Sequence, residues 1–452
     1  MMKLLRRIAT LVALFSAGMS TLLFVENRAP RGVYLWLPKL LAGALAPFLG
    51  LLGLISAAVG LFSGGWSALV CGGYSALAAW QYLDGTLRRP QGTMRPRFRR
   101  AFGPEWEKCL MAKTSPQQRG TMRQRRWSWL TTEDPEPRWL RDVPFWSDPD
   151  SSRTLLCDVW LPPGDIPQTG LGILYFHGSA WCLGDKDFGT RAFFRHLAAQ
   201  GHVIVDAQFR LVPETNMAGM LADAKRAVAW FKANAEKYGV DPQRIVSAGF
   251  SAGGQLALLV AYTSRDRRLT PPELWGADLT MHAAVSHAGC YDLHALYDHS
   301  RQWLPIYAKL AAQDQKVCAF VYRLSDVLCR VTGNGGKSEA LARKFAHLAI
   351  AGHLPSILDG TPDEVPEVYT RYSPISYAGP GVPPTFLVQG ADDIAAPVDV
   401  AYELSAKLHG CGVPVVNLVF PHAEHGFDLV LPRISPVAQS AQYELDRFLA
   451  LL

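Results

Sequence analysis

The stretch Ile245-Val246-Ser247-Ala248-Gly249-Phe250-Ser251-Ala252-Gly253-Gly254 decides the fold of this chain. It begins as an apolar run of the kind that forms a buried strand, breaks into Gly-x-Ser-x-Gly, and continues into helix-forming residues at 255–260. A serine on such a turn is exposed and strained, and the glycines let neighbouring backbone pass close to it. The stretch predicts a strand, a sharp turn that presents Ser251 as a nucleophile, and a helix. A turn of small residues without chemistry is the alternative.

An upstream strand pattern ends in a second turn of small residues. Residues 171–176 are apolar, and His177-Gly178-Ser179-Ala180-Trp181 follows them. The tetrahedral intermediate of acyl transfer carries a negatively charged oxygen, which fixed N–H donors stabilise. We expect the main-chain N–H groups of Gly178, Ser179 and Ala252 to be those donors.

Two strand patterns near the C-terminus are each followed by candidate acid or base side chains. Residues 385–390 precede Asp392 and Asp393, and residues 415–420 precede His422 and His425. The carboxyl ends of parallel strands share one rim of a sheet, so these side chains are expected beside Ser251. A histidine there takes the serine proton when a carboxylate fixes its tautomer. We interpret His425 as the base; His422 is the rival, with a solvated loop histidine as its alternative.

The order serine, aspartate, histidine along the chain is that of an α/β-hydrolase. From about Arg141 to the C-terminus, the sequence resembles the esterase and lipase branch of that superfamily, which includes hormone-sensitive-lipase-like and prenylcysteine-methylesterase-like enzymes. Five further motifs carry the resemblance. Residues 177–181 are similar to His-Gly-Gly-Gly/Ala-Trp/Phe, 209–214 to Tyr-Arg-Leu-Ala-Pro-Glu, 241–245 to the family's lead into the nucleophile strand, 390–393 to Gly-x-x-Asp, and 425–427 to His-Gly-Phe.

This resemblance implies a doubly wound α/β fold with a mainly parallel sheet, and a serine hydrolase of carboxylic esters that uses no cofactor. It implies that Asp393, rather than Asp392, is the acid. It also implies supporting roles for His177, Gly249 and Gly253 around the nucleophile and the oxyanion site.

Two positions depart from the family pattern. Ser179 stands where the family has its second glycine, and Phe209 stands where it has tyrosine. The first change keeps the main-chain donor, and the second removes a hydroxyl from a position that is more structural than chemical. Neither change touches Ser251, Asp393 or His425.

The N-terminal hundred residues have a different composition. The chain has 452 residues, of which the hydrolase region takes about 310. Three uncharged segments, at 8–25, 40–62 and 66–83, match the roughly 17 to 25 residues that a membrane-spanning helix needs. We predict a membrane anchor of two or three transmembrane helices over 1–87. A buried hairpin of a soluble domain and an N-terminal signal peptide are the alternatives.

Residues 88–140 form a basic segment that contains several tryptophans, and the hydrolase domain is expected over 141–452. Six arginines between 88 and 100 follow the last apolar segment, which favours a cytoplasmic catalytic domain by the positive-inside rule. The basic residues at positions 3, 6 and 7 also favour the cytoplasm, and three spans cannot put both flanks on one side. We expect a multi-pass membrane protein with a cytoplasm-facing hydrolase.

The net charge of +6 does not indicate nucleic acid, because no nucleic-acid fold pattern accompanies it. Arginines at 123, 125 and 126 beside tryptophans at 127 and 129 predict an anchor on anionic lipid headgroups. Eight cysteines are scattered without Cys-x-x-Cys spacing, so we expect no metal site and no disulfide framework. Cys182, beside the 177–181 turn, is expected to be a buried small hydrophobe. Residues 333–338 resemble part of a phosphate loop and are interpreted as an ordinary turn.

About eighty residues, 294–372, separate the strand pattern near 283–286 from Ser373-Pro374-Ile375. An insertion after a strand end falls on the active-site rim, so we predict a helical lid. Its apolar side chains are expected to line an acyl or prenyl pocket: Trp303, Leu304, Ile306, Tyr307, Phe320, Val321 and Tyr322. A surface excursion with no part in binding is the alternative.

The sequence therefore predicts a membrane-anchored serine carboxylesterase or lipase-like enzyme that cleaves a hydrophobic ester through an acyl-enzyme on Ser251. The expected partners are the ester substrate and membrane lipids. An acyltransferase with the same three residues, and a non-catalytic, hydrolase-like binding module at the membrane, are the alternative functions.

Overall fold

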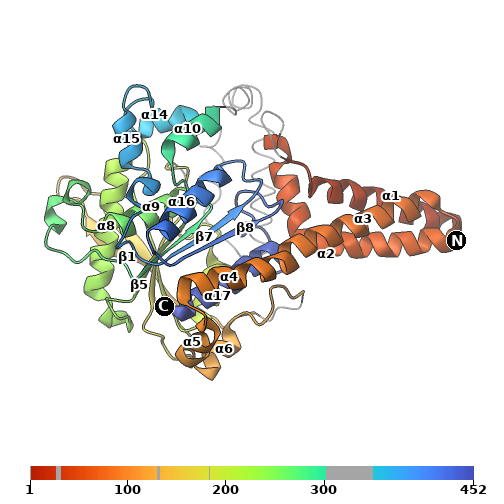
Figure 1. Ribbon diagram of the computed structural model, residues 1–452, viewed down its shortest axis with the longest axis horizontal. Coiled ribbons are helices and arrows are strands. Elements are labelled where there is room, and N and C mark those ends of the chain that lie inside the picture. The colour runs from red at the N-terminus through yellow and green to blue at the C-terminus, as the bar shows by residue number, and fades with distance from the viewer. Residues whose placement is uncertain (1, 27–31, 130–132, 183, 302–349) are drawn as a thin grey trace.

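The computed structural model describes residues 2–26, 32–129, 133–182, 184–301 and 350–452. An α/β domain carries a rod of three long helices, and the N-terminus lies at the far tip of that rod (Figure 1). The rod consists of α1 (Met2–Leu22), α2 (Gly32–Ser63) and α3 (Trp66–Leu83). α1 and α3 therefore both have their C-terminal ends at the α/β domain, and α2 begins there.

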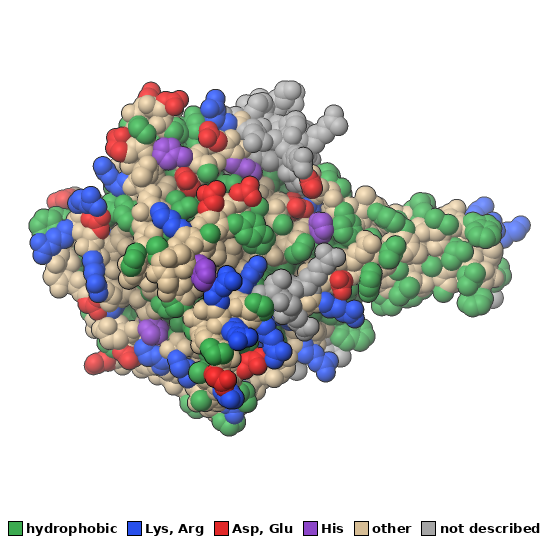
Figure 2. Space-filling model, viewed as in Figure 1, with side chains coloured by type: hydrophobic (Ala, Val, Ile, Leu, Met, Phe, Trp, Pro, Cys, Tyr) green, Lys and Arg blue, Asp and Glu red, His purple; other side chains and the backbone are tan. Residues whose placement is uncertain are grey.

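The rod buries small side chains and exposes large ones. Buried positions between its helices include Ala13, Ala42 and Ala68, and the Oγ atoms of Ser20 and Ser75 lie 2.9 Å apart. Of the exposed large hydrophobic side chains in the described residues, all but Met111, Trp129, Trp275 and Tyr402 lie on the rod. The hydrophobic surface is visible along its length in Figure 2. This arrangement is the reverse of a soluble bundle.

Two described helices are long and apolar enough to cross a membrane: Met2–Leu22, and the part of α2 from Leu35 to Ser63. α3, which coincides with the third predicted segment at 66–83, is not among them. The number of spans therefore stays a prediction.

The α/β domain is built on one sheet of eight strands in the order β1-β2-β4-β3-β5-β6-β7-β8. β1 and β2 pair antiparallel, β2 pairs antiparallel with β4, and all later pairings are parallel. The predicted doubly wound, mainly parallel sheet is confirmed. The strands are β1 (Arg138–Ser147), β2 (Thr154–Leu161), β3 (Gly172–Phe176), β4 (Val203–Ala207), β5 (Ile245–Phe250), β6 (Ala283–His287), β7 (Thr385–Gly390) and β8 (Val415–Phe420).

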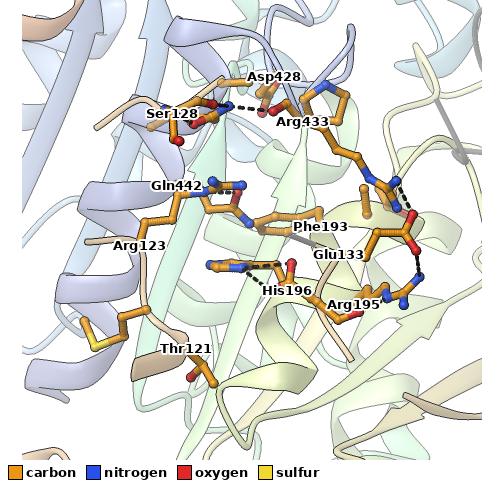
Figure 3. Close-up of a pocket in the computed structure, with 18 of the residues that line it drawn as sticks. Thr121, Arg123, Ser128, Glu133, Phe193, Arg195, His196, Asp428, Arg433 and Gln442 are labelled. Atoms are coloured by element: carbon orange, nitrogen blue, oxygen red, sulfur yellow. Dashed lines mark hydrogen bonds and ion pairs between the residues drawn. The ribbon is translucent and has the colours of Figure 1, made fainter. Parts of the chain in front are cut away.

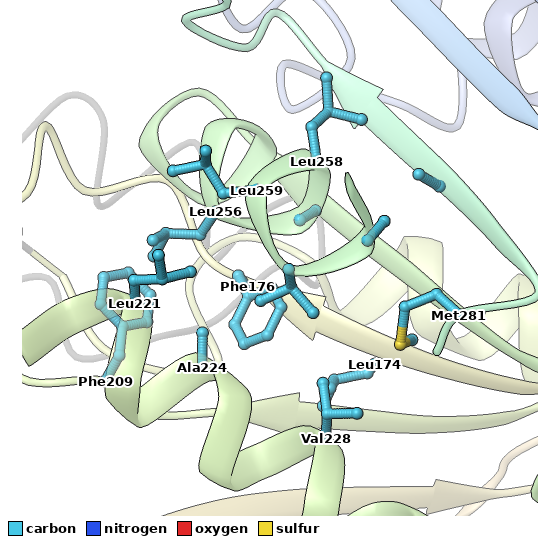
Figure 4. Packing of buried hydrophobic residues seen from close by; sticks show 14 of the residues in the cluster. Leu174, Phe176, Phe209, Leu221, Ala224, Val228, Leu256, Leu258, Leu259 and Met281 are labelled. Atoms are coloured by element: carbon cyan, nitrogen blue, oxygen red, sulfur yellow. The ribbon is translucent and has the colours of Figure 1, made fainter. Parts of the chain in front are cut away.

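Helices cover both faces of this sheet because each central strand is apolar on both sides. One face packs against α8 (Met217–Asn234), α9 (Ala252–Tyr262) and α16 (Val398–Gly410). Figure 4 shows the core on that face, where Leu174 and Phe176 of β3 meet side chains of α8 and α9. The opposite face packs against α7 (Arg191–Ala199) and α17 (Pro436–Leu451).

The edge strand β1 begins at Arg138, inside the segment that the sequence analysis assigned to the linker. Most of its residues are exposed or half-buried, and two register shifts interrupt its pairing with β2. An exposed, irregular edge strand has no continuous apolar run, so the sequence pattern did not predict it.

The basic segment before β1 is helical and packs onto the domain. It forms a π-helical turn (Asp84–Arg88), α4 (Arg89–Phe102), α5 (Trp106–Lys113) and α6 (Pro116–Thr121). Met94, Phe98 and Trp106 are buried in the same cluster as Phe448 of α17. These helices thus belong to the α/β domain.

The predicted headgroup anchor at residues 123–129 was wrong for two of its side chains. The guanidinium of Arg126 pairs with the buried carboxylate of Glu444, and Trp127 Nε1 donates to the carbonyl of Ile434 at 2.9 Å. Both side chains are held against the protein because α17 and the loop that precedes it offer them partners. Trp129, in contrast, is exposed.

The predicted lid is helical at its described ends. They form α10 (Leu293–Arg301), α14 (Ile350–Ile357) and α15 (Pro366–Arg371). The side chains that were predicted to line an apolar pocket, Trp303 to Tyr322, lie outside the described residues, as does the turn at 333–338.

Short 3-10 turns lie at Glu236–Tyr238, Arg267–Leu269, Pro272–Leu274 and Pro374–Tyr377.

Candidate active site

The turn between β5 and α9 holds Ser251 in a strained backbone conformation. Its φ and ψ are 55° and −121°, a region that residues other than glycine rarely adopt. Its main-chain N–H donates to the carbonyl of His287 at the end of β6, 2.8 Å away. A Cβ on Gly249 would lie 2.3 Å from the carbonyl oxygen of Gly253, and one on Gly253 would lie 2.0 Å from that of Phe176. Only glycine fits at these two positions.

The structure brings Ser251, His425 and Asp393 into one chain of hydrogen bonds. His425 Nε2 lies 3.0 Å from Ser251 Oγ. On the other side of the ring, Nδ1 lies 3.0 Å from both carboxylate oxygens of Asp393. The Asp393 carboxylate also accepts from the main-chain N–H groups of Ala395 and Ala396, at 2.9 and 2.8 Å. These bonds fix a buried carboxylate behind the imidazole.

The environment of His425 favours its protonated form. Burial alone disfavours the imidazolium, but the negative charge and hydrogen bonds of Asp393 outweigh burial, so the pKa of His425 is raised above its usual value. An imidazole that readily accepts a proton suits the role of a general base.

The two rival side chains lie elsewhere. Asp392 is directed away from His425 and pairs with Lys39, with 2.5 Å between its Oδ2 and the lysine Nζ. His422 is partly exposed, and its ring meets Phe24 edge to face with 4.9 Å between the ring centres.

Three main-chain N–H groups, two on the turn after β3 and one directly after Ser251, have no acceptor among the described residues. Within the part of the chain that the structure describes, no atom accepts a hydrogen bond from the N–H of Gly178, Ser179 or Ala252. The Ser179 hydroxyl instead accepts from the N–H of Trp181 at 3.0 Å, which tightens the turn. Cys182 is buried next to it.

Phe209, at the position where the family has tyrosine, stacks on His177. Their ring centres lie 4.5 Å apart, with an angle of 20° between the planes. Both side chains are buried, and burial lowers the pKa of His177 to about 4. His177 is therefore a neutral ring at physiological pH, in keeping with a supporting role.

Three residues near the site were missed by the sequence analysis: Trp36 and Lys39 of α2, and Glu424 beside His425. Trp36 Nε1 donates to the carbonyl of His425 at 3.0 Å, and Lys39 Nζ lies 3.3 Å from Glu424 Oε1. The available signal was a single lysine, Lys39, at the edge of the uncharged segment 40–62.

The comparisons with known proteins agree with this architecture. A family model described as BD-FAE matches residues 157–325. The probable carboxylic ester hydrolase LipM of Mycobacterium tuberculosis is 28% identical over 277 residues, which cover 60% of this chain and 53% of LipM. Esterase LipC of the same organism is 29% identical, covering 61% of this chain and 57% of LipC. These comparisons support an esterase and lipase family of the α/β-hydrolase type for this chain.

This α/β-hydrolase spans about half the length of LipM and LipC. Among solved structures, Thermogutta terrifontis esterase 2 phosphonylated by sarin is similar at 20% identity and a TM-score of 0.49, covering 70% of this chain and 95% of that esterase.

In this α/β-hydrolase, the motif at 209–214 is held by a buried ion pair. Arg210 Nε and Nη2 each donate to the carboxylate of Asp223 at 2.8 Å, and the main-chain N–H of Arg210 donates to it at 3.0 Å. Asp223 has no exposed surface. The pair fastens the loop after β4 to α8 and so supports the neighbouring ring of Phe209.

A cavity of about 470 Å³ lies between α7, α17 and the described residues of 120–128 and 133–135 (Figure 3). Arg123, Arg195, His196, His287 and Asp428 are among the residues that line it. His287 Nδ1 lies 2.7 Å from Asp428 Oδ2. Ser251 and His425 do not line this cavity, so it is separate from the hydrogen-bond chain of the site. Among the described residues, no group of three or more His, Cys, Asp or Glu side chains is arranged to hold a metal ion.

Proposed function

We propose that this protein is a membrane-anchored serine hydrolase of hydrophobic carboxylic esters, with Ser251 as nucleophile, His425 as general base and Asp393 as the acid that orients it. The observation that carries the proposal is the hydrogen-bond chain of these three side chains, next to three main-chain N–H groups that have no acceptor among the described residues. The esterase names of LipM and LipC support the same class of reaction.

In this mechanism, Ser251 Oγ attacks the ester carbonyl carbon while His425 Nε2 takes the hydroxyl proton. The resulting oxyanion accepts hydrogen bonds from the N–H groups of Gly178, Ser179 and Ala252. The intermediate collapses, and the alcohol leaves with the proton that His425 returns. Water then attacks the acyl-enzyme by the same sequence of proton transfers, and the carboxylic acid is released.

Membrane insertion of the rod is supported by its packing. A Cβ on Gly72 would lie 2.5 Å from the carbonyl oxygen of Gly53, so α2 and α3 approach as closely as small-residue contacts allow. Such contacts, with large hydrophobic side chains outside, are typical of helices in lipid. The ring of Phe24 and the indole of Trp36 join the base of the rod to the loop that carries His425. An ester with long apolar chains would therefore reach the site from the bilayer surface.

We further propose that the hydrolase faces the cytoplasm. Arg6 contacts Gly65 at the α2–α3 turn, so the N-terminal basic residues belong to the tip of the rod, opposite the α/β domain. The larger group of arginines, from Arg88 to Arg100, belongs to the hydrolase end, and positive charge favours the cytoplasmic side.

Labelling of Cys109 tests this orientation, because that thiol is exposed on α5 beside the hydrolase. An impermeant maleimide, quantified on the Cys109 peptide by mass spectrometry, should react in inverted membrane vesicles and not in right-side-out vesicles. The opposite pattern would contradict a cytoplasmic hydrolase, while recovery of the protein in the soluble fraction would contradict insertion itself.

The reaction is tested with a series of p-nitrophenyl esters from acetyl to palmitoyl and with a fluorophosphonate probe. The detergent-solubilised protein should hydrolyse the esters and should be labelled on Ser251, and a preference for long chains would support a lipid-like substrate. Acyl transfer to an added alcohol in place of hydrolysis would instead favour an acyltransferase.

A further inference from the structure

The first turns of α2 lie against the loop that carries His425. Trp36 Nε1 donates to the main-chain carbonyl of His425 at 3.0 Å. Leu40, one turn later, is buried in the same cluster as Phe420 and Phe427, which flank that loop. The rod therefore contacts His425, the predicted base, directly at its main-chain carbonyl.

A single ammonium group joins the neighbours of the predicted acid and base. Lys39 Nζ lies 2.5 Å from Asp392 Oδ2 and 3.3 Å from Glu424 Oε1, and it donates to the carbonyl of Val25 at 2.7 Å. Asp392 directly precedes Asp393 in the loop after β7, and Glu424 directly precedes His425 in the loop after β8. Lys39 thus bridges the two loops that must keep Asp393 and His425 in contact.

The bridge is buried, so each of its charges depends on the others. The side chains of Lys39 and Glu424 are each 1% exposed. Burial raises the pKa of Glu424 to about 7, and the positive charge of Lys39 is the strongest influence in the opposite direction. Removal of the ammonium would leave the buried carboxylate of Glu424 and the partly exposed carboxylate of Asp392 without this cation, which favours a rearrangement of the loop that carries Glu424.

We propose that Trp36 and Lys39 are positioning residues, through which the membrane rod sets the position of His425 against Ser251 and Asp393. The inference rests on the proposed function of these three residues. It makes the rod part of the active site as well as an anchor. Catalysis depends on such positioning, since an error of 1 Å in a reacting group costs on the order of 100-fold in rate.

The cleanest test replaces Trp36 by phenylalanine, which keeps an aromatic ring and removes only the indole donor. Trp127→Phe is the matched control, because Trp127 Nε1 also donates to a main-chain carbonyl, that of Ile434, at 2.9 Å. In the full-length protein, Trp36→Phe should lower kcat on the order of 10-fold with little change in KM. Trp127→Phe should leave both constants unchanged.

The second variant is Lys39→Met, with Lys225→Met as its control. Lys225 is also fully buried and donates to the Thr263 carbonyl and the Thr270 hydroxyl, but it lies in α8 and touches neither loop. Lys39→Met should slow fluorophosphonate labelling of Ser251 on the order of 100-fold in protein that still elutes as a folded species. Adding Asp392→Asn to Lys39→Met should cause little further loss of labelling rate, because both substitutions break the same bridge.

Wild-type rates in both Trp36→Phe and Lys39→Met would overturn the positioning role while leaving the proposed function intact. If the wild-type protein neither hydrolyses esters nor reacts with the probe, the proposed function fails. The positioning role of Trp36 is then tested by NMR of the His425 imidazole. The N–H proton of His425 that bonds to Asp393 should give a low-field signal, which is assigned by its loss in His425→Gln. This signal should shift in Trp36→Phe and should not shift in Trp127→Phe. An unshifted proton would overturn the inference.

Discussion

The imidazole Nε2 of His425 lies 3.0 Å from the hydroxyl oxygen of Ser251, although 174 residues separate the two in the sequence. β5 and β8 bring them together, because the carboxyl ends of parallel strands meet at one rim of the sheet. The reactivity of the proposed site therefore depends on the protonation of His425 and on the backbone around Ser251.

The pH dependence of kcat/KM should report His425. The pKa of this imidazole is raised, because the Asp393 carboxylate outweighs the opposing effect of burial. Only the neutral ring accepts the serine proton, so activity should rise with pH through a midpoint above the ordinary histidine value of about 6.5. The carboxylate of Glu424 also raises this pKa. Glu424→Gln should therefore move the midpoint to lower pH; a midpoint well below 6 in the wild type would contradict the assignment.

The turn at Ser251 should not tolerate a methyl group on Gly253. An added Cβ would lie 2.0 Å from the carbonyl oxygen of Phe176, so Gly253→Ala must displace β3 or α9. We expect a loss of about 1–3 kcal/mol in stability, as for other overpacked sites, and loss of fluorophosphonate labelling. Gly276→Ala is the control, because its Cβ would meet nothing within 4 Å. Equal stability and labelling of the two variants, by thermal unfolding and gel fluorescence, would be inconsistent with this geometry.

Stability should depend on pH through the buried pair of His196 and Asp446. His196 Nε2 lies 3.1 Å from Asp446 Oδ2. Burial disfavours the imidazolium, but the charges of Asp446 and Asp134 raise the pKa of His196 to about 9. The contribution of this group is therefore fully present below about pH 6.5 and is lost as pH rises through 9.

Asp446, the partner of His196, titrates at the acidic end of the pH range. Although burial opposes ionisation, His196 and the hydrogen bonds to the carboxylate lower the pKa of Asp446 to about 2. Its contribution is present above about pH 4 and is lost as pH falls through 2. The difference in apparent Tm between wild type and His196→Gln should thus be largest between about pH 4 and 6.5. A difference that is constant from pH 5 to 9.5 would contradict the charged pair.

The rod of α1, α2 and α3 offers two adjacent glycines with opposite surroundings. A Cβ on Gly72 would lie 2.5 Å from the carbonyl oxygen of Gly53, whereas one on Gly73 would meet nothing within 4 Å. Gly72→Leu should separate α2 from α3 and lower the apparent Tm in detergent. Gly73→Leu should be tolerated, because it adds an apolar side chain to a surface that is already exposed and apolar. Equal effects of the two substitutions would speak against the packing of the rod.

Strands buried on both faces were the most predictable elements. Residues 245–250, 385–390 and 415–420 are mainly apolar runs followed by turn residues, and each prediction matches the strand in the structure. β1 lacked such a run because it is an exposed edge strand. α4 carries four arginines between 95 and 100, so its amphipathic pattern was interpreted only as charge.

The site residues that belong to sequence motifs were predictable. Ser251, Asp393 and His425 follow strand patterns, and parallel topology brings such positions to one rim. Lys39 was not predictable, because its partners Asp392 and Glu424 lie more than 350 residues away and no motif links them. Only the folded structure shows that Lys39, at the edge of the apolar segment 40–62, touches both loops of the site.

The most direct test of the central claim is p-nitrophenyl ester hydrolysis by wild type and Ser251→Ala, with intact mass spectrometry of each protein after a brief incubation. The account predicts hydrolysis by the wild type together with one added acyl group on Ser251. It also predicts a loss of activity by a factor of about 10⁴ or more, with no mass increase, in Ser251→Ala. Equal hydrolysis by the two proteins, or a wild type that neither hydrolyses the ester nor gains an acyl group, would contradict it.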